Sequence, residues 1–308
     1  MAAVNVDNAA PPGSFGAMAE QLRLMTIHAH PDDEASKGAG TVARYREQGV
    51  RSVLVCCTGG EAGEILNPAM DTPEVRERLA AVRMEELARS AEVIGYDEVA
   101  LLGYRDSGMA DTETNADPEC FAAAPLDDAV GRLVALIRTH RPHVIVTYAD
   151  DQQGYPHPDH LRVHDISLPA FDQAGDPDVL PVAGAGEPWQ QLKLYYTMWS
   201  RARMVAMHEK FTQLGLESPF DEQWFARPSH DDRLTTRIDV GAYYDVRADA
   251  LLAHATQIDP TSPFWFGLPR DEAAKVHPWD DYILARSLVD TDLPEDDLFA
   301  GVRASVAR

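Results

Sequence analysis

Short apolar runs alternate with helix-compatible stretches through the first half of this chain, and this alternation constrains the fold most strongly. The apolar runs cover residues 22–28, 52–58, 98–104 and 143–148. The intervening stretches space their apolar side chains much as an amphipathic helix does. They cover residues 36–48, 74–94 and 126–139. This β-α-β-α order predicts an α/β fold, with a mostly parallel sheet flanked by helices on both faces.

The C-terminal third is less regular. Its expected strands are residues 193–198 and 234–240. Its expected helices are residues 201–214 and 243–257. Residues 174–190 are rich in Gly, Ala and Pro and are expected to form a loop. We predict a flexible N-terminal extension over residues 1–20 and a single domain over residues 21–308, a length that can bury a sizeable core.

Charge and cysteine content narrow the range of partners and compartments. The net charge of −23 argues against nucleic-acid phosphate and anionic membrane surfaces as partners. No run approaches the roughly 20 apolar residues that span a bilayer, and the N-terminus lacks the features of a secretory signal. Cys56, Cys57 and Cys120 form no CxxC motif, which favours a reducing compartment. We therefore expect a cytoplasmic protein.

Two short strings carry most of the residues suited to chemistry. HAHPDDE (28–34) directly follows the first predicted strand, and YPHPDH (155–160) follows the fourth. Open α/β sheets bind ligands at the carboxyl ends of their parallel strands, so the strings can meet in space. A single HPD triplet is typical of an ordinary turn. Two of them, each followed by another metal-capable residue, favour a shared metal site.

A catalytic zinc ion takes three protein ligands and keeps one position open. His30 and Asp33 would supply two ligands and His160 the third, giving one zinc ion per chain. Such a zinc ion lowers the pKa of its water to about 7. Iron or cobalt would suit the same donors.

Four neighbouring residues could complete the catalytic machinery. Asp32 adjoins a predicted ligand and is the expected general base. His157 would act as an acid or oxyanion partner, with a second metal ligand as the alternative. Asp159 would hydrogen-bond His157 and keep it charged, and Tyr155 would polarise the carbonyl. A metal-binding protein without catalysis would need neither Asp32 nor His157.

The HPDDE and HPDH strings, in this order and context, resemble the PIG-L/LmbE-like zinc N-deacetylase family. The resemblance implies a Rossmann-like α/β fold and hydrolysis of the acyl amide on an amino sugar. It assigns zinc binding to His30, Asp33 and His160, the base to Asp32 and electrostatic catalysis to His157. Tyr155 matches a tyrosine that touches the scissile carbonyl.

Within that family the chain is most similar to the amidases that cleave mycothiol S-conjugates into N-acetylcysteine S-conjugates and glucosaminyl inositol. The supporting strings are SKGA (36–39), GEILNPAMD (63–71), GYPHPDH (154–160) and HATQIDP (254–260). RDSGM (105–109) is instead similar to the N-acetylglucosaminyl inositol deacetylases, which are the alternative. The setting would be detoxification or thiol-linked natural-product biosynthesis.

The resemblance also implies which residues contact the small-molecule substrate, an amino-sugar and thiol conjugate. Residues matching Glu61, Arg83 and Asp106 contact its sugar or inositol part, although Arg83 could instead form a salt bridge on a helix surface. Lys37 would donate a hydrogen bond to the cysteinyl acyl group, whereas an acetyl group offers no such distal acceptor. The alternative is that Lys37 merely lies on a helix surface. The oligomeric state is left open, including a homo-oligomer.

Overall fold

The computed structural model describes residues 20–152, 155–179 and 186–306 and confirms the predicted α/β class. In this part of the chain the strands form a seven-stranded sheet of order β3-β2-β1-β4-β5-β7-β6. The strands are β1 (Arg23–His28), β2 (Arg51–Thr58), β3 (Glu98–Tyr104), β4 (Val144–Tyr148), β5 (Lys193–Met198), β6 (Thr236–Asp239) and β7 (Trp279–Ser287). β1 to β5 pair in parallel, whereas β7 pairs antiparallel with β5 and β6. The predicted N-terminal extension lies outside the described residues, except for Glu20.

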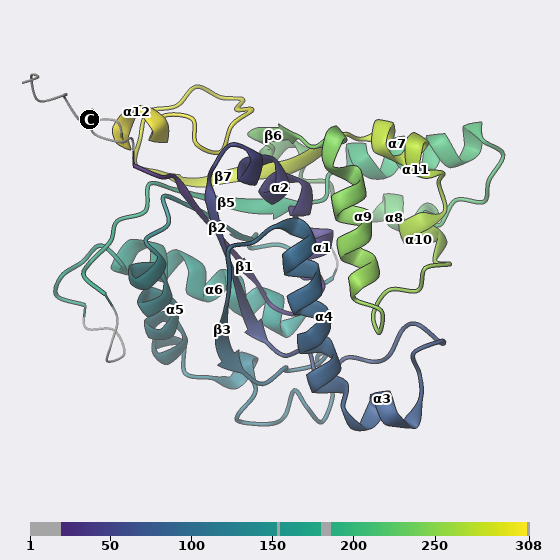
Figure 1. The fold of residues 1–308 in the computed structure, drawn as a ribbon, viewed down its shortest axis with the longest axis horizontal. Coiled ribbons are helices and arrows are strands. Elements are labelled where there is room, and N and C mark those ends of the chain that lie inside the picture. Colours follow the sequence, from purple (N-terminus) through teal and green to yellow (C-terminus); the bar gives the residue numbers. More distant parts are fainter. Residues whose placement is uncertain (1–19, 153–154, 180–185, 307–308) are drawn as a thin grey trace, which may run out of the picture.

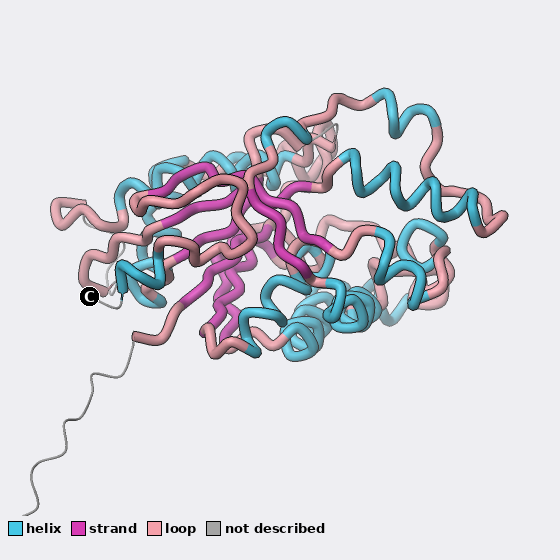
Figure 2. Tube along the Cα trace, turned by 90° about the horizontal axis from the view of Figure 1, so that it is seen from above, coloured by secondary structure: helices cyan, strands magenta, loops and turns pink. Residues whose placement is uncertain are grey.

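Helices cover both faces of the sheet (Figure 1), and Figure 2 shows the strong twist of the strands between them. Successive side chains of β1 point to opposite faces, so Ile27 joins the core beneath α5 and α6 while Leu24 joins the core beneath α2 and α9. The longer helices are α2 (Ala39–Glu47), α4 (Leu79–Ile94), α5 (Leu126–His140), α6 (Pro158–Gln173), α7 (Arg201–Gln213) and α9 (Tyr244–Ala253).

Shorter helices connect these elements. They are α1 (Asp33–Ser36), α3 (Pro73–Glu77), α8 (Glu222–Ala226), α10 (Pro263–Phe266), α11 (Arg270–Val276), α12 (Val302–Val306) and the 3-10 turns η1 (Phe121–Ala123), η2 (Asp231–Arg233) and η3 (Gly241–Tyr243). Among the helices of the described chain, none has the length and apolar content needed to cross a membrane.

Two predicted helices are interrupted in the structure. The stretch 74–94 is divided between α3 and α4, because Arg78 leaves helical geometry with φ −117°. The stretch 36–48 is divided by Gly38, whose φ of 102° lies in the left-handed region that glycine tolerates. A β-carbon on Gly38 would also lie 3.1 Å from the Tyr282 hydroxyl, so this position favours glycine twice over.

The strand order positions the two conspicuous strings of the sequence. β1 and β4 are neighbours, so the loops that follow them leave the same edge of the sheet side by side. Loops after β2 and β3 lie on one side of this pair, and the segment after β5 lies on the other. The predicted meeting of residues 28–34 with residues 155–160 therefore follows from topology.

A buried ion pair joins β5 to the chain segment after β7. The side chains of Lys193 and Glu295 are both inaccessible to solvent, and the Lys193 ammonium donates to the Glu295 carboxylate. Glu295 also accepts hydrogen bonds from the Tyr195 hydroxyl at 2.6 Å and the Thr236 hydroxyl at 3.0 Å. This carboxylate therefore links β5, β6 and the C-terminal segment.

We predict that Glu295→Ala lowers the free energy of unfolding by about 3–5 kcal/mol, because it leaves the Lys193 ammonium buried without a counter-charge. Urea denaturation followed by circular dichroism measures the change. The control is Asp249→Ala, which removes one partner of exposed Arg270 (2.8 Å) and should cost about 0–1 kcal/mol. Equal losses in the two variants would show that the buried pair does not hold these elements together.

Candidate metal and active site

The turn after β1 presents three site residues in different directions. Asp32 has φ 112°, a left-handed conformation that non-glycine residues rarely adopt, and it precedes α1. The Asp33 carboxylate accepts the backbone N–H of His30 at 3.0 Å, which closes the turn. Strained backbone of this kind concentrates at functional sites. Consecutive carboxylates can thereby contact different partners.

The second string forms the start of α6. His157 is the N-cap residue, and its Nδ1 accepts the backbone N–H of Asp159 at 3.2 Å. Pro158 occupies the first helical position, where its missing N–H is not needed. His160 follows in the first turn of the helix and faces the loop after β1, with its ring centre 5.3 Å from that of His30.

Asp33 stands between the two histidines expected to bind metal. Its Oδ2 lies 3.4 Å from His30 Nδ1 and 3.4 Å from His160 Nε2, and all three residues are buried. Tetrahedral zinc with bonds of 2.0–2.2 Å separates neighbouring ligand atoms by about 3.3–3.6 Å. Two imidazoles and a carboxylate at this spacing fit a zinc ion.

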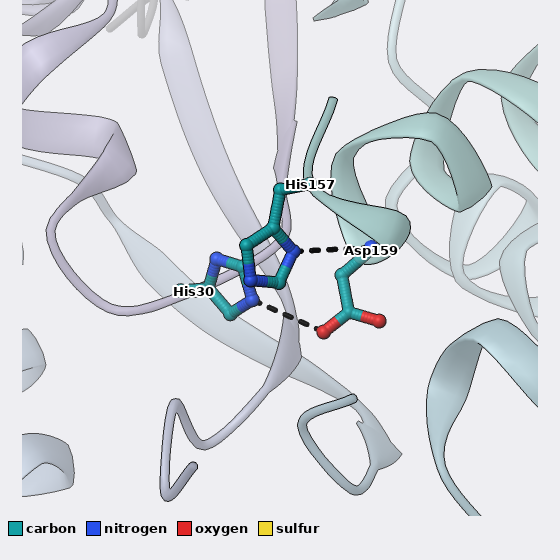
Figure 3. A group of neighbouring side chains, drawn as sticks. All are labelled: His30, His157 and Asp159. Carbon is teal, nitrogen blue, oxygen red and sulfur yellow. Dashed lines mark hydrogen bonds and ion pairs between the residues drawn. The ribbon is translucent and has the colours of Figure 1, made fainter. Parts of the chain in front are cut away.

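A second donor group overlaps the first and consists of His30, His157 and Asp159 (Figure 3). Its carboxylate is already engaged, since Asp159 accepts hydrogen bonds from the Ser107 backbone at 3.0 Å and from the Ser107 hydroxyl. Asp159 also lies 3.1 Å from His30 Nε2. A carboxylate on one ring nitrogen directs the other toward the metal, as is common for ligating histidines. This arrangement favours the group built on Asp33.

The electrostatics of Asp32 suit a general base. Burial raises the pKa of Asp32, opposed by the Arg83 guanidinium and aided by the Asp33 carboxylate. Arg83 Nη2 lies 3.2 Å from Asp32 Oδ2 and 2.6 Å from the Pro31 carbonyl. A raised pKa brings the carboxylate closer to the value at which a base is most effective near neutral pH.

The expectation that Asp159 keeps His157 charged is wrong. The Asp159 carboxylate contacts Ser107 and His30, and His157 Nδ1 instead accepts a backbone N–H. Burial, together with the neighbouring His30 and His160, lowers the pKa of His157 to about 4. A neutral His157 that accepts at Nδ1 carries its proton on Nε2, where it can donate a hydrogen bond.

Lys37 and Tyr155 both line the pocket around the donor group. The Lys37 ammonium lies 2.5 Å from Asp33 Oδ1 and 5.5 Å from the centre of the Tyr148 ring. Lys37 therefore pairs with a candidate metal ligand and does not merely lie on a helix surface. The Tyr155 side chain is half-exposed, with its ring centre 5.8 Å from that of His160.

The residues expected to contact the sugar form a network beside the pocket. Glu61 accepts the backbone N–H of Asp106 at 3.1 Å, and Asp106 accepts that of Ala62 at 3.1 Å. Arg83 is only 3% exposed and donates to the carbonyls of Gly60 and Pro31, so the alternative of a helix-surface salt bridge is wrong. Arg83 and Asp106 line the pocket, and their contacts with a sugar remain predictions.

Three contacts of the site were not foreseen from the sequence. Ser107 holds Asp159, and the Tyr148 hydroxyl accepts the Ala29 backbone N–H at 3.3 Å. His254, in the string HATQIDP, lies 2.6 Å from Glu34, so the C-terminal third supports the turn after β1. Ser107 lies in the string RDSGM and His254 in HATQIDP, but their partners are 52 and 220 residues away along the chain, respectively.

Comparison with known proteins places this site in context. The model of the PIG-L family, described as GlcNAc-PI de-N-acetylase, matches residues 25–171, which include both strings. The chain is 45% identical to the mycothiol S-conjugate amidase of Streptomyces coelicolor, covering 93% of this chain and 99% of that protein. It is 38% identical to the 1D-myo-inositol 2-acetamido-2-deoxy-alpha-D-glucopyranoside deacetylase of Geodermatophilus obscurus, covering 92% and 99% of the two chains.

Among solved structures, the N,N'-diacetylchitobiose deacetylase of Pyrococcus horikoshii is similar with a TM-score of 0.57. The match covers 85% of this chain and 83% of that chain, at 16% sequence identity. At this identity the likeness shows a shared fold alone.

We predict that the purified protein contains about one zinc-site metal per chain and that His160→Ala loses it, because two donors hold zinc poorly. Elemental analysis after gel filtration measures the content. His164→Ala is the control, since His164 lies on the same helix but hydrogen-bonds the Tyr148 carbonyl at 3.1 Å. Full metal content in His160→Ala would refute the assignment.

Proposed function

Because the chain belongs to the PIG-L family and is an amide hydrolase, we propose that its substrate is a mycothiol S-conjugate. Hydrolysis of the amide would release an N-acetylcysteine S-conjugate and glucosaminyl inositol. We place this reaction in detoxification or in thiol-linked natural-product biosynthesis. We place the reaction in the cytoplasm, in keeping with the free cysteines Cys56, Cys57 and Cys120.

The size of the pocket favours a mycothiol S-conjugate over an acetylated substrate. The cavity around His30, Asp33 and His160 has a volume of about 790 Å³ and continues past these residues to the segment after β5. Pockets for drug-sized ligands span roughly 300–1,000 Å³. With the amino sugar bound on the β2–β3 side, an acetyl group would leave the β5 side of this cavity empty, whereas a cysteinyl group with its S-substituent would extend into it.

The chain's own residues can carry the proton movements of amide hydrolysis. Zinc held by His30, Asp33 and His160 would supply Lewis-acid polarisation of the carbonyl and a water of lowered pKa. Asp32 takes a proton from the attacking water and returns it to the amine as the C–N bond breaks. His157 donates from Nε2 to the carbonyl oxygen as negative charge develops there. Arg83 holds Asp32 in place.

Removal of an acetyl group from N-acetylglucosaminyl inositol is the alternative. The supporting observation is the 38% identity to the Geodermatophilus obscurus deacetylase over 92% of this chain. A non-catalytic metal- or sugar-binding protein is less well supported, because binding alone requires neither the raised pKa of Asp32 nor a neutral His157 that can donate from Nε2.

We predict that kcat/KM for a mycothiol S-conjugate exceeds that for N-acetylglucosaminyl inositol by about tenfold or more, because the larger acyl group makes contacts that acetyl lacks. Steady-state assays on the zinc-loaded enzyme measure both values. A preference for the acetylated substrate would move the assignment to the deacetylase. Turnover of neither substrate would contradict both.

We predict that Asp32→Asn retains metal but loses about 10²–10⁴ in kcat, since it removes the general base. Asparagine tolerates the left-handed backbone at this position, so the turn should persist. Asp33→Asn is the matched variant and should lose the metal itself. If metal content falls in Asp32→Asn and persists in Asp33→Asn, the two roles are reversed.

A further inference from the structure

The pocket has two chemically different sides, and the strand order separates them. The central loops after β1 and β4 carry the candidate metal ligands. Toward β2 and β3 the lining includes the charged or hydroxylated side chains of Glu64, Arg83, Asp106 and Thr112. Beyond β5 the lining includes Trp199, Met204, Trp224, Phe225, Phe264 and Trp265, together with the polar side chains of Arg227, His230 and Arg233. The aromatic rings are thus gathered on the β5 side, so a substrate whose amide lies between the two sides can place an apolar group against them.

The β5 side is an aromatic chamber, which we define as Trp199, Trp224, Phe225, Phe264 and Trp265. Trp199 stacks on Phe264 with ring centres 5.8 Å apart, and Trp224 lies 5.7 Å from the same ring. All five side chains are only partly buried and line the pocket, and the Arg227 guanidinium lies over the Trp224 ring, 3.9 Å from its centre. Aromatic rings at these separations attract further rings in offset or edge-to-face arrangements.

Hydrogen bonds hold the wall of this chamber in place. The Arg201 guanidinium donates to the carbonyls of Phe225, at 2.6 Å, and Arg227, which fixes the end of α8 against the start of α7. Asp231 accepts two backbone N–H groups at the start of α7, at 2.8 and 2.9 Å. Arg233 lies 2.8 Å from Asp150, which follows β4. A wall anchored at both ends is preorganised to bind a ligand.

We propose that the aromatic chamber binds the S-substituent of the conjugate and selects bulky aromatic thioethers over small alkyl ones. This inference rests on the proposed function. The hydroxyl-rich sugar and inositol rings need hydrogen-bonding partners, which line the β2–β3 side. The acyl half of the substrate leaves the scissile carbonyl in the opposite direction, toward the chamber. A ring on sulfur there would exchange water for aromatic contacts.

The test compares S-benzyl and S-methyl conjugates that are otherwise identical. We expect kcat/KM to favour the benzyl conjugate by about 10-fold or more in the intact enzyme. Trp224→Ala should reduce that ratio several-fold, and an unchanged circular dichroism spectrum and metal content would show that the variant is folded. Trp279→Ala, which removes a partly exposed tryptophan that is not in the pocket lining, should keep the ratio.

A binding experiment separates this inference from catalysis. In isothermal titration calorimetry, N-acetyl-S-benzylcysteine should bind the enzyme more tightly than N-acetyl-S-methylcysteine. Trp224→Ala should abolish this difference in affinity. Equal rates and affinities for benzyl and methyl compounds would overturn the chamber proposal while the amidase assignment stands. An equal loss for both conjugates in Trp224→Ala would assign the aromatic wall to the sugar and also overturn it. Turnover of neither conjugate would instead contradict the proposed function.

Discussion

The rest of the site depends on the contacts that the buried Asp33 carboxylate makes. It is 3% exposed, and such a charge is stable away from water only when several partners compensate for its lost solvation. Burial alone would raise the pKa of Asp33, but Lys37 and His160 lower this pKa well below its ordinary range. Its bond to the His30 backbone shapes the turn after β1, and its contacts with His160 bring α6 to that turn.

A second buried carboxylate extends this dependence to the C-terminal third. Glu34 is fully buried and accepts from the Ser90 hydroxyl on α4 at 2.5 Å, and it lies 2.6 Å from His254 after α9. Its other oxygen accepts the backbone N–H of Asp32 at 3.0 Å. The left-handed conformation of Asp32 is thus supported by groups that arrive from α4 and α9. The elaborated C-terminal region therefore supports the turn after β1 as well as lining the pocket.

The sequence was informative where local pattern determines structure. Apolar periodicity located β1 to β5 and most of the longer helices, and the parallel order brought His30 and His160 together. Local pattern did not predict elements that are stabilised by partners far away in the sequence. β7 begins with acidic residues that look unsuited to a buried strand, but Asp280 accepts two hydrogen bonds from Thr41, 239 residues away. The contacts of Asp159 likewise cannot be predicted from local pattern, because its partner Ser107 lies in a different loop.

The sheet assigns chemistry and selectivity to different strands. Loops after β1 and β4 present the candidate ligands and base, whereas the segments after β2, β3 and β5 form the outer pocket. Loops can diverge without disturbing the strands that carry them, so one centre can serve amidases and deacetylases. Lys37 is an exception to this separation. Because its ammonium touches Asp33 and also lines the pocket, replacing it changes the charge around a candidate metal ligand together with the pocket wall. Any contact of Lys37 with a substrate is therefore coupled to the charge of Asp33, whereas the aromatic chamber lies apart from the candidate ligands.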